Sequence, residues 1–256
     1  MRWIAPRRST GTARTELWLV DLRRAGPALR ALERACPRLS PGDRRRARRL
    51  GQGRERSDRL AAYVALRLLL ERADGPRIRG REFLRSGSGK PRLRGGAAFS
   101  LAHTGSLALI GITHARAIGI DLEPARPVRV SPRRRAEIVA AARGLAGAPL
   151  DAEDGDGAFL QAWSRLEAYA KAHGEGLDRV LAQLGLRAAS GREMAISEIE
   201  SAARRLARGA GVIVRDVALP RGLTGAVAIA GHGAPPRLSL LPAGRRALRR
   251  LADGRC

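Results

Sequence analysis

The chain has 256 residues, of which 44 % are hydrophobic and 3 % aromatic, and its formal net charge is +25. This length is enough for one large domain or two small ones, and no stretch is apolar and long enough to predict a secretory signal or a membrane span. The two cysteines, Cys36 and Cys256, have neither metal-binding nor redox spacing, which excludes a disulfide framework and favours a reducing, cytoplasmic setting.

The positive charge comes almost entirely from arginine, because only Lys90 and Lys171 among the 49 basic residues are lysine. One interpretation is an acidic partner: nucleic acid, an anionic membrane, an acidic protein or a phosphorylated ligand. The other is the bias of a GC-rich coding sequence, which needs no function. Under that bias a lysine is unusual, and its compact ammonium suits a tight phosphate site better than the wide arginine fork. Chance survival of two lysine codons is the alternative.

The N-terminal half is predicted to mix helices and strands. Ser40 followed by Pro41 is typical of a helix start, and Leu60, Val64 and Leu68 recur at the spacing of a buried helix face. Alternating or continuous apolar runs predict the strands. The predicted elements are a loose basic leader at 1–14, a strand at 16–22, a short helix from 26 that ends near Pro37, two helices from 40 to about 74 with a break near Gly51 and Gly53, and strands at 97–102, 107–113 and 117–123.

The C-terminal half is predicted to be similar in content. Ser131 and Gly174 are typical of a helix start and a helix end. The predicted elements are a helix at 131–145, an acidic loop at 147–157, a helix at 158–174, strands at 212–219 and 225–231, and a peripheral tail at 234–256. The sequence therefore predicts an α+β protein of two similar α/β halves, 15–116 and 117–233, packed against each other.

Two carboxylates mark the end of the third predicted strand of the first group. Asp121 and Glu123 lie two residues apart, so their side chains share one face of the strand. Carboxylates placed so close repel each other unless a cation lies between them, and hard oxygen ligands suit Mg²⁺. A solvated strand end with two acids is the alternative.

The helix at 158–174 carries a second charged group. Glu167 and Lys171 are four residues apart and share a helix face with Trp163. An ordinary surface ion pair explains this spacing, but a third carboxylate and an ammonium near a metal would suit phosphoryl transfer, in which the protein positions and neutralises oxyanions.

Three further features lie in the first half. His103 ends an apolar run, where it is either structural, a phosphate donor or a proton shuttle. Residues 44–59 form a basic strip, which is either a solvated helix face or a polyphosphate clamp. "SGSGKP", with Lys90 and Pro91, fails the P-loop pattern but can still approach a phosphate.

Taken in order, these stretches resemble the 4′-phosphopantetheinyl transferases of the surfactin-synthetase-activating type, from about residue 16 to 232. The blocks that carry the resemblance are "SPGDRRRARRL…RSDRLAAYVALRLLL", "GKP", "FSLAHTGSLALIGITHARAIGIDLE" and "FLQAWSRLEAYAKAHGEGL". The resemblance implies the fold of that family, in which two similar α/β halves pack as a pseudo-twofold, and a cytoplasmic, magnesium-dependent enzyme. Such an enzyme moves the phosphopantetheine arm of coenzyme A to a serine of an apo acyl or peptidyl carrier protein and releases 3′,5′-ADP.

The resemblance also implies roles for individual residues. Asp121, Glu123 and Glu167 would hold Mg²⁺, Lys171 would contact the phosphates, and Glu167 or a metal-bound water would accept the serine proton. His103 would also reach coenzyme A. The implied contacts for its nucleotide end are Lys90, Pro91, Arg46, Arg49 and Arg59. The carrier is expected to be acidic near its serine, so the basic chain would attract it, and the enzyme is expected to be a monomer.

The chain departs from the family pattern at a few positions. Leu166 stands where a lysine is common, Ser100 and Ala102 replace an asparagine and a serine, and Asp43 stands where a lysine is often found. Two alternatives therefore stay open: a catalytically impaired member of the family, or a basic nucleic-acid-binding protein. Scarce aromatic residues and the lack of a nucleic-acid module signature speak against the second, and a membrane partner is not expected.

Overall fold

A computed structural model describes residues 14–49, 52–85, 87, 89–150, 155–186, 194–231 and 235–252. The predicted leader lies outside these residues apart from Arg14. The first group of elements is β1 (Thr15–Asp21), α1 (Leu22–Ala35), α2 (Pro41–Arg49), α3 (Gly53–Asp74), the 3-10 helix η1 (Pro76–Ile78), β2 (Leu84–Arg85), β3 (Pro91–Arg92), β4 (Ala98–Thr104) and β5 (Leu107–Thr113). The second group is β6 (Ile118–Pro124), α4 (Pro132–Ala146), α5 (Gly155–His173), α6 (Leu177–Gln183), α7 (Ile196–Ala210), β7 (Val212–Asp216), β8 (Leu223–Ala230), β9 (Arg237–Leu240) and α8 (Arg245–Leu251).

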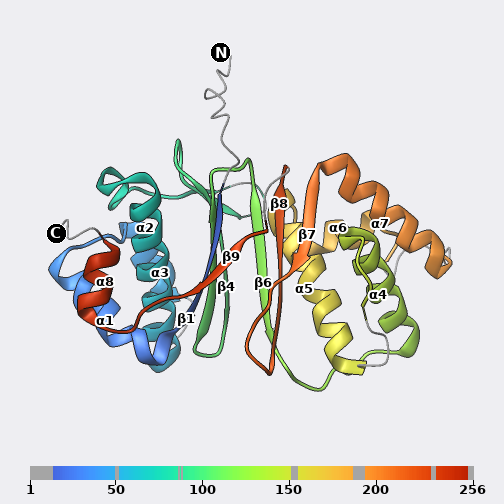
Figure 1. The fold of residues 1–256 in the computed structure, drawn as a ribbon, viewed down its shortest axis with the longest axis horizontal. Helices are drawn as coiled ribbons and strands as arrows, with labels where there is room; N and C mark the ends of the chain where they lie inside the picture. Colours follow the sequence, from blue (N-terminus) through green and yellow to red (C-terminus); the bar gives the residue numbers. More distant parts are fainter. Residues whose placement is uncertain are drawn as a thin grey trace, which may run out of the picture.

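Two sheets lie back to back in the centre, with helices outside each (Figure 1). The first sheet has the order β4-β5-β1-β9 and is covered by α1, α3 and α8; the second has the order β6-β8-β7 and is covered by α4, α5 and α7. β2 and β3 form a separate hairpin. The chain is thus a mixed α+β protein, as predicted, and the seam between its halves lies between Thr113 and Ile118.

The alternation of side chains along the strands explains these four layers. In β1, Trp18 and Val20 pack toward the helices of the first half, whereas Leu17 and Leu19 pack between the two sheets. A strand presents successive side chains to opposite faces, so a strand that is apolar at both parities is buried on both sides. The core between the sheets joins the two halves into one body.

Most predicted elements are present in the structure. The four strands predicted before residue 125 correspond to β1, β4, β5 and β6 and end within two residues of the predicted positions, and α2 and α3 are separate helices. Ser131 caps α4 as predicted, because its hydroxyl accepts a hydrogen bond from the Arg134 amide at 3.2 Å. Gly174 ends α5 with a φ of +79°.

Two helical regions differ from the prediction. α1 begins at Leu22, four residues early, because the Asp21 carboxylate caps it by accepting from the amides of Arg23 and Arg24. The prediction also omits α6 and α7. α7 has a clear signal, because Ile199, Ala203 and Ala207 recur every four residues and are buried.

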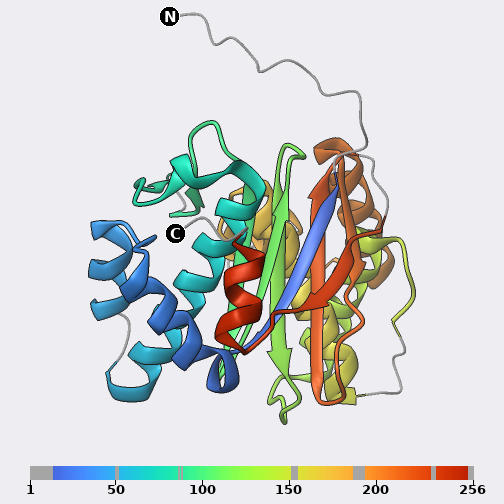
Figure 2. The ribbon, with the colours of Figure 1, turned by 60° about the vertical axis from the view of Figure 1, so that its left-hand side comes forward.

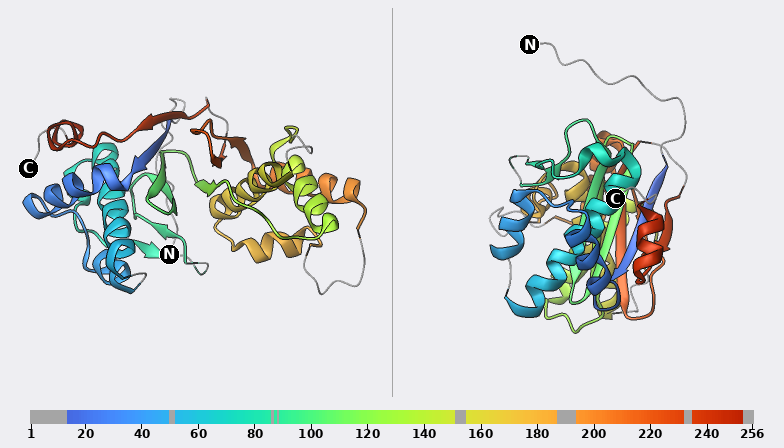
Figure 3. Two further views of the ribbon diagram at one scale, coloured as in Figure 1. Left: turned by 90° about the horizontal axis from the view of Figure 1, so that it is seen from below. Right: turned by 90° about the vertical axis from the view of Figure 1, so that its left-hand side faces the viewer.

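The prediction of a peripheral C-terminal tail is wrong. β9 pairs in parallel with β1 at the edge of the first sheet, and Leu248 of α8 is fully buried in the core of the first half. Figure 2 shows β9 beside β1, and the left view of Figure 3 shows the tail returning to the first half. The prediction failed for two reasons. The tail is rich in proline and arginine and has only a few leucines at helix or strand spacing. In addition, its pairing with β1 joins the two ends of the chain, and local sequence pattern cannot predict such a contact. Among the helices in the described ranges, none combines the length and the apolar character needed to cross a membrane.

Candidate functional site

A cavity of about 530 Å³ lies where the two halves meet. The first half contributes side chains from α2, α3, the β2–β3 hairpin and β4, and the second half contributes β6, α5 and the short segment after α5. The cavity is lined by Arg46, Arg59, Lys90, Pro91, His103, Asp121, Glu123, Glu167 and Lys171 among others. Tertiary packing therefore brings together every predicted site residue except Arg49, which is exposed on α2 and does not line the cavity.

Strand β6 presents its acids to helix α5 because of its side-chain alternation. Ile118, Ile120 and Leu122 pack between the two sheets, so Asp121 and Glu123 lie on the opposite face, together with Gly119. A Cβ on Gly119 would lie 2.0 Å from the Ala168 carbonyl oxygen of α5. Only glycine allows the helix to approach the strand this closely, which carries the polar turn of α5 onto the carboxylates.

Helix α5 adds a carboxylate and an ammonium to that face. The Lys171 ammonium donates to Asp121 Oδ1 at 2.7 Å and lies 3.8 Å from Glu167 Oε2. The second carboxylate of β6, Glu123, pairs with Arg126 at 3.2 Å. The Glu167–Lys171 pair predicted from the sequence is thus part of a cluster across two elements.

The cluster shifts the acidity of Glu167. Burial raises the pKa of its carboxyl, and Asp121 and Glu123 raise it further, although the Lys171 ammonium acts in the opposite direction. A carboxyl with a raised pKa is a better proton acceptor than an ordinary surface glutamate. The carboxylates of Asp121 and Glu123 are therefore close enough to interact with that of Glu167.

The carboxylate oxygens of Asp121, Glu123 and Glu167 are the type of ligand that a hard divalent cation prefers, although they do not converge on one point. Asp121 Oδ2 is buried and has no hydrogen-bond partner among the described residues, and such an oxygen is costly unless a cation or proton compensates it. Within the described ranges, no three acidic, histidine or cysteine side chains already stand close enough to hold one ion. Instead, Lys171 is paired with Asp121, and Arg126 is paired with Glu123. The Lys171 and Arg126 side chains would have to shift before the three carboxylates could share a magnesium ion.

His103 and Arg59 form a second polar group on the cavity wall. The Nε2 atom of His103 and the Nε atom of Arg59 are buried, and neither has a hydrogen-bond partner in the part of the chain that the structure describes. Burial lowers the pKa of His103, and the nearby Arg59 lowers it further. The unsatisfied Arg59 donor, together with a His103 nitrogen that donates when it carries the ring proton, suits an anionic ligand such as a phosphate.

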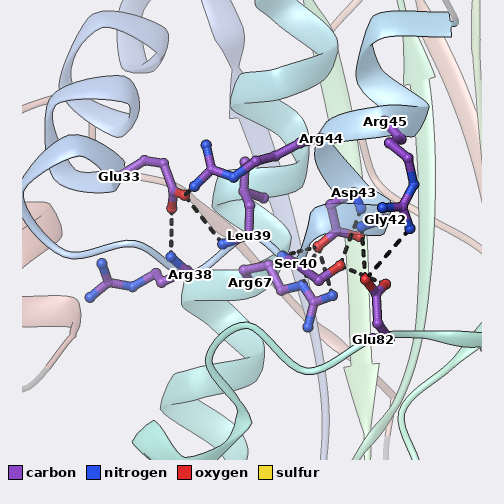
Figure 4. Close-up of polar contacts among 10 residues, drawn as sticks. All are labelled: Glu33, Arg38, Leu39, Ser40, Gly42, Asp43, Arg44, Arg45, Arg67 and Glu82. Carbon is purple, nitrogen blue, oxygen red and sulfur yellow. Dashed lines mark hydrogen bonds and ion pairs between the residues drawn. The ribbon is translucent and has the colours of Figure 1, made fainter.

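A network of hydrogen bonds and ion pairs fixes α2, the helix that carries Arg46 (Figure 4). The Ser40 hydroxyl accepts from the Asp43 amide, and the Asp43 carboxylate accepts from the Ser40 amide, both at 3.1 Å. The Glu82 carboxylate accepts from the Gly42 amide at 2.8 Å and from the Ser40 hydroxyl at 2.9 Å. The start of α2 is thus bound to the segment that leads into the hairpin.

Asp43, one of the departures from the family pattern, is part of this network. Its carboxylate lies 2.6 Å from Arg67, and the two side chains are 5 % and 0 % exposed. The Arg67 guanidinium also stacks on Phe83, at 3.6 Å from the ring centroid. Asp43 therefore anchors α2 to α3 and does not line the cavity, so this position does not present a phosphate contact.

The other departures also have structural explanations. Ala102 is buried in the core between the two sheets. Leu166 is fully buried in the core of the second half. The Ser100 hydroxyl accepts a hydrogen bond from the Ile120 amide at 3.1 Å, which ties β4 to β6. The neighbouring Arg165 is fully buried and binds both oxygens of Asp216, at 2.7 and 2.6 Å, which fixes α5 against β7.

The sequence prediction missed several residues that line the cavity. These residues include Tyr63 on α3, and Phe83 and Arg85 at the start of the hairpin. At the hairpin, loop geometry decides which side chains turn inward. Glu175 follows α5 and contributes another acid. The only available sequence signal was the scarcity of aromatic residues, and three of them, Tyr63, Phe83 and Phe99, line this cavity.

Comparison with protein families gives one match. Residues 117–210 match the model of the 4′-phosphopantetheinyl transferase superfamily. The match spans β6 to α7 and includes Asp121, Glu123, Glu167 and Lys171. No curated protein sequence matches the chain. The match supports phosphopantetheinyl transfer in general and covers the carboxylate side of the cavity.

Proposed function

We propose that this protein transfers the 4′-phosphopantetheine arm of coenzyme A to a serine of an apo acyl or peptidyl carrier protein, in a magnesium-dependent reaction that releases 3′,5′-ADP. One observation carries the proposal: the carboxylates of β6 and α5 face the same cavity as the basic residues of the first half. The carboxylate side of that cavity lies in the segment that matches the superfamily.

The transfer requires an anionic pyrophosphate and a divalent cation to be held together. Asp121, Glu123 and Glu167 would hold Mg²⁺, which offsets negative charge on the phosphate oxygens when it is bound. Lys171, now bonded to Asp121, would contact the same phosphates from α5. Arg46 and Arg59 line the same cavity from the first half and are the proposed contacts of the nucleotide end, and His103 is proposed to reach coenzyme A as well.

The chain also supplies a proton acceptor for the carrier serine. The serine oxygen would attack the phosphorus that bears the pantetheine arm, and the bond from this phosphorus to the bridging oxygen of 3′,5′-ADP would break. Glu167 is the chain's own candidate to accept the serine proton, because its carboxylate lines the same cavity. Lys171 would offset the charge that develops on the leaving oxygen.

The direct test is intact-mass spectrometry of a panel of apo carriers incubated with the protein, coenzyme A and Mg²⁺. We expect a carrier serine to gain the phosphopantetheine mass. If no carrier gains it while the protein is folded, the proposal is wrong. Affinity for nucleic acid that collapses steeply with salt, without any transfer, would favour the nucleic-acid-binding alternative.

Substitutions separate the proposed site from a surface cluster. Glu167→Gln and Asp121→Asn should abolish transfer and leave the fold intact, whereas Glu200→Gln, a matched change at a half-buried position of α7 outside the cavity, should leave transfer unchanged. Lys171→Met should lower turnover strongly. Wild-type rates in either carboxylate variant would refute the metal assignment.

The proposal extends to the state of the protein. The two halves are proposed to be related by a pseudo-twofold, as in the surfactin-synthetase-activating type, and the enzyme is proposed to act as a cytoplasmic monomer. The cavity is formed by two halves of one chain, so a second copy is not needed to complete it. Size-exclusion chromatography with light scattering tests the monomer.

A further inference from the structure

The side chain of Lys90 crosses from the first half to the second. Lys90 precedes β3 in the hairpin, and its ammonium donates to the Ile118 carbonyl of β6 at 2.8 Å and to the Lys171 carbonyl of α5. The side chain is half-buried, and burial lowers its pKa to about 8. A single ammonium thus connects the hairpin, the second sheet and the helix that carries Glu167.

Neither carbonyl accepts the hydrogen bond that a helix interior or an inner strand would provide, because one lies at the end of α5 and the other at the edge of the second sheet. Lys171 lies in the last turn of α5, and the amide that would normally bond to its carbonyl, that of Glu175, donates to Ala170 instead. A cation at this place also complements the negative end of the helix dipole. Lys90 therefore acts as a cap for α5 supplied by the other half of the chain.

The second carbonyl belongs to the outer edge of a sheet. β6 is an edge strand of its sheet, and the amide of Ile120 points outward to the Ser100 hydroxyl. Residues two apart in a strand direct their backbone groups to the same side, so the Ile118 carbonyl also points outward. Lys90 and Ser100 thus satisfy consecutive backbone groups on an edge that would otherwise be exposed to pairing.

This geometry explains why the position holds a lysine in a chain rich in arginine. The ammonium is small and has three donors on one nitrogen, so it fits between two converging carbonyl oxygens. A guanidinium is planar and spreads its donors over a wider fork, which does not fit the same space without moving a strand or a helix.

We infer that Lys90 is a positioning residue that holds the Glu167–Lys171 turn of α5 in place across the seam, and not a ligand of the coenzyme. Its contact with the Lys171 carbonyl fixes the backbone one turn from Glu167, while Gly119 holds the other side of the same turn. The inference rests on the proposed transfer for its kinetic consequence and differs from the nucleotide contact that the sequence resemblance implies.

The test compares Lys90→Met with Arg92→Met, an exposed basic position on the same hairpin. Coenzyme A affinity is measured by calorimetry, Tm by thermal unfolding, and kcat and KM by carrier loading. For Lys90→Met we expect coenzyme affinity within about threefold of wild type, kcat lower by roughly tenfold or more, and Tm lower by roughly 4 °C or more. Arg92→Met should match wild type in all of these.

The result that overturns the inference is a loss of coenzyme affinity of about tenfold or more with Tm unchanged, which is expected of a ligand. Lys90→Arg provides a second measurement if the methionine variant does not fold. This variant keeps the charge, so a ligand role predicts wild-type kcat, whereas a positioning role predicts a lower kcat with an unchanged KM for coenzyme A. If the wild-type protein transfers nothing, the proposed function is wrong, but the cap can still be tested by hydrogen exchange. Faster amide exchange at Gly174 and Glu175 in Lys90→Met would support the cap, and unchanged exchange would refute it.

Discussion

Replacing Gly119 by alanine tests the contact that forms the site. The added Cβ would lie 2.0 Å from the Ala168 carbonyl oxygen, 2.3 Å from the Ala172 nitrogen and 2.9 Å from the Lys171 carbonyl carbon. These atoms are helix backbone and cannot rotate away. The constraint is spatial, because Gly119 is not among the glycines with positive φ.

The size of the effect follows from this geometry. The shortest contact falls about 1.4 Å below an ordinary van der Waals distance of 3.4 Å, so α5 must move away from β6 by a comparable amount. Overpacking of this kind costs about 1–3 kcal/mol of unfolding free energy. A displacement of about 1 Å between Glu167 and Asp121 should lower kcat roughly 100-fold.

The assay measures urea unfolding and carrier loading for Gly119→Ala and for a matched control, Gly209→Ala. Nothing lies within 4 Å of a Cβ on Gly209, which is inside α7, so this control should be as stable as wild type or slightly more stable. A Gly119→Ala variant with wild-type stability and wild-type kcat would show that the close approach of α5 and β6 does not hold the site together.

Three further predictions concern the supporting structure. Asp43→Asn should lower the unfolding free energy by about 3–5 kcal/mol, because it leaves the buried Arg67 guanidinium without its counter-charge; urea unfolding with no change would contradict the anchor. Leu248→Ala should cost about 2–5 kcal/mol, since this side chain is 0 % exposed, whereas Leu240→Ala, 71 % exposed, should cost little; equal effects would mean that the tail is peripheral after all. The pKa of Lys90 in the folded protein is about 8, below its ordinary 10.5, so the unfolded chain binds the proton more tightly. The unfolding free energy of the wild type should therefore rise relative to that of Lys90→Met between about pH 8 and pH 10.5. A difference that stays constant from pH 7 to pH 10 would refute this assignment.

Local sequence pattern was sufficient for most of the strands and helices. Apolar alternation located β1, β4, β5 and β6, and the serine at 131 correctly marked the start of α4. These signals are local, because side-chain periodicity and capping depend on residues a few positions apart. α7 shows that a usable local signal was also overlooked.

The site residues were predictable for two different reasons. Asp121 with Glu123, and Glu167 with Lys171, are detectable because strand and helix periodicity place each pair on one face. The resemblance then related the two pairs to each other. Arg49 fails to line the cavity because the α2 helix turns it to solvent, a rotation that the position in the sequence does not specify.

The sequence by itself determined which residues carry the charge, where the strands alternate and which acids share a face. The tertiary structure alone decided that the tail completes the first sheet, that Asp43 anchors α2, and that Lys90 binds carbonyls of the other half. The reason is physical: these contacts join groups far apart in the chain, and their partners are backbone atoms or buried charges. Their availability depends on how sheets and helices pack, which residue identity does not record.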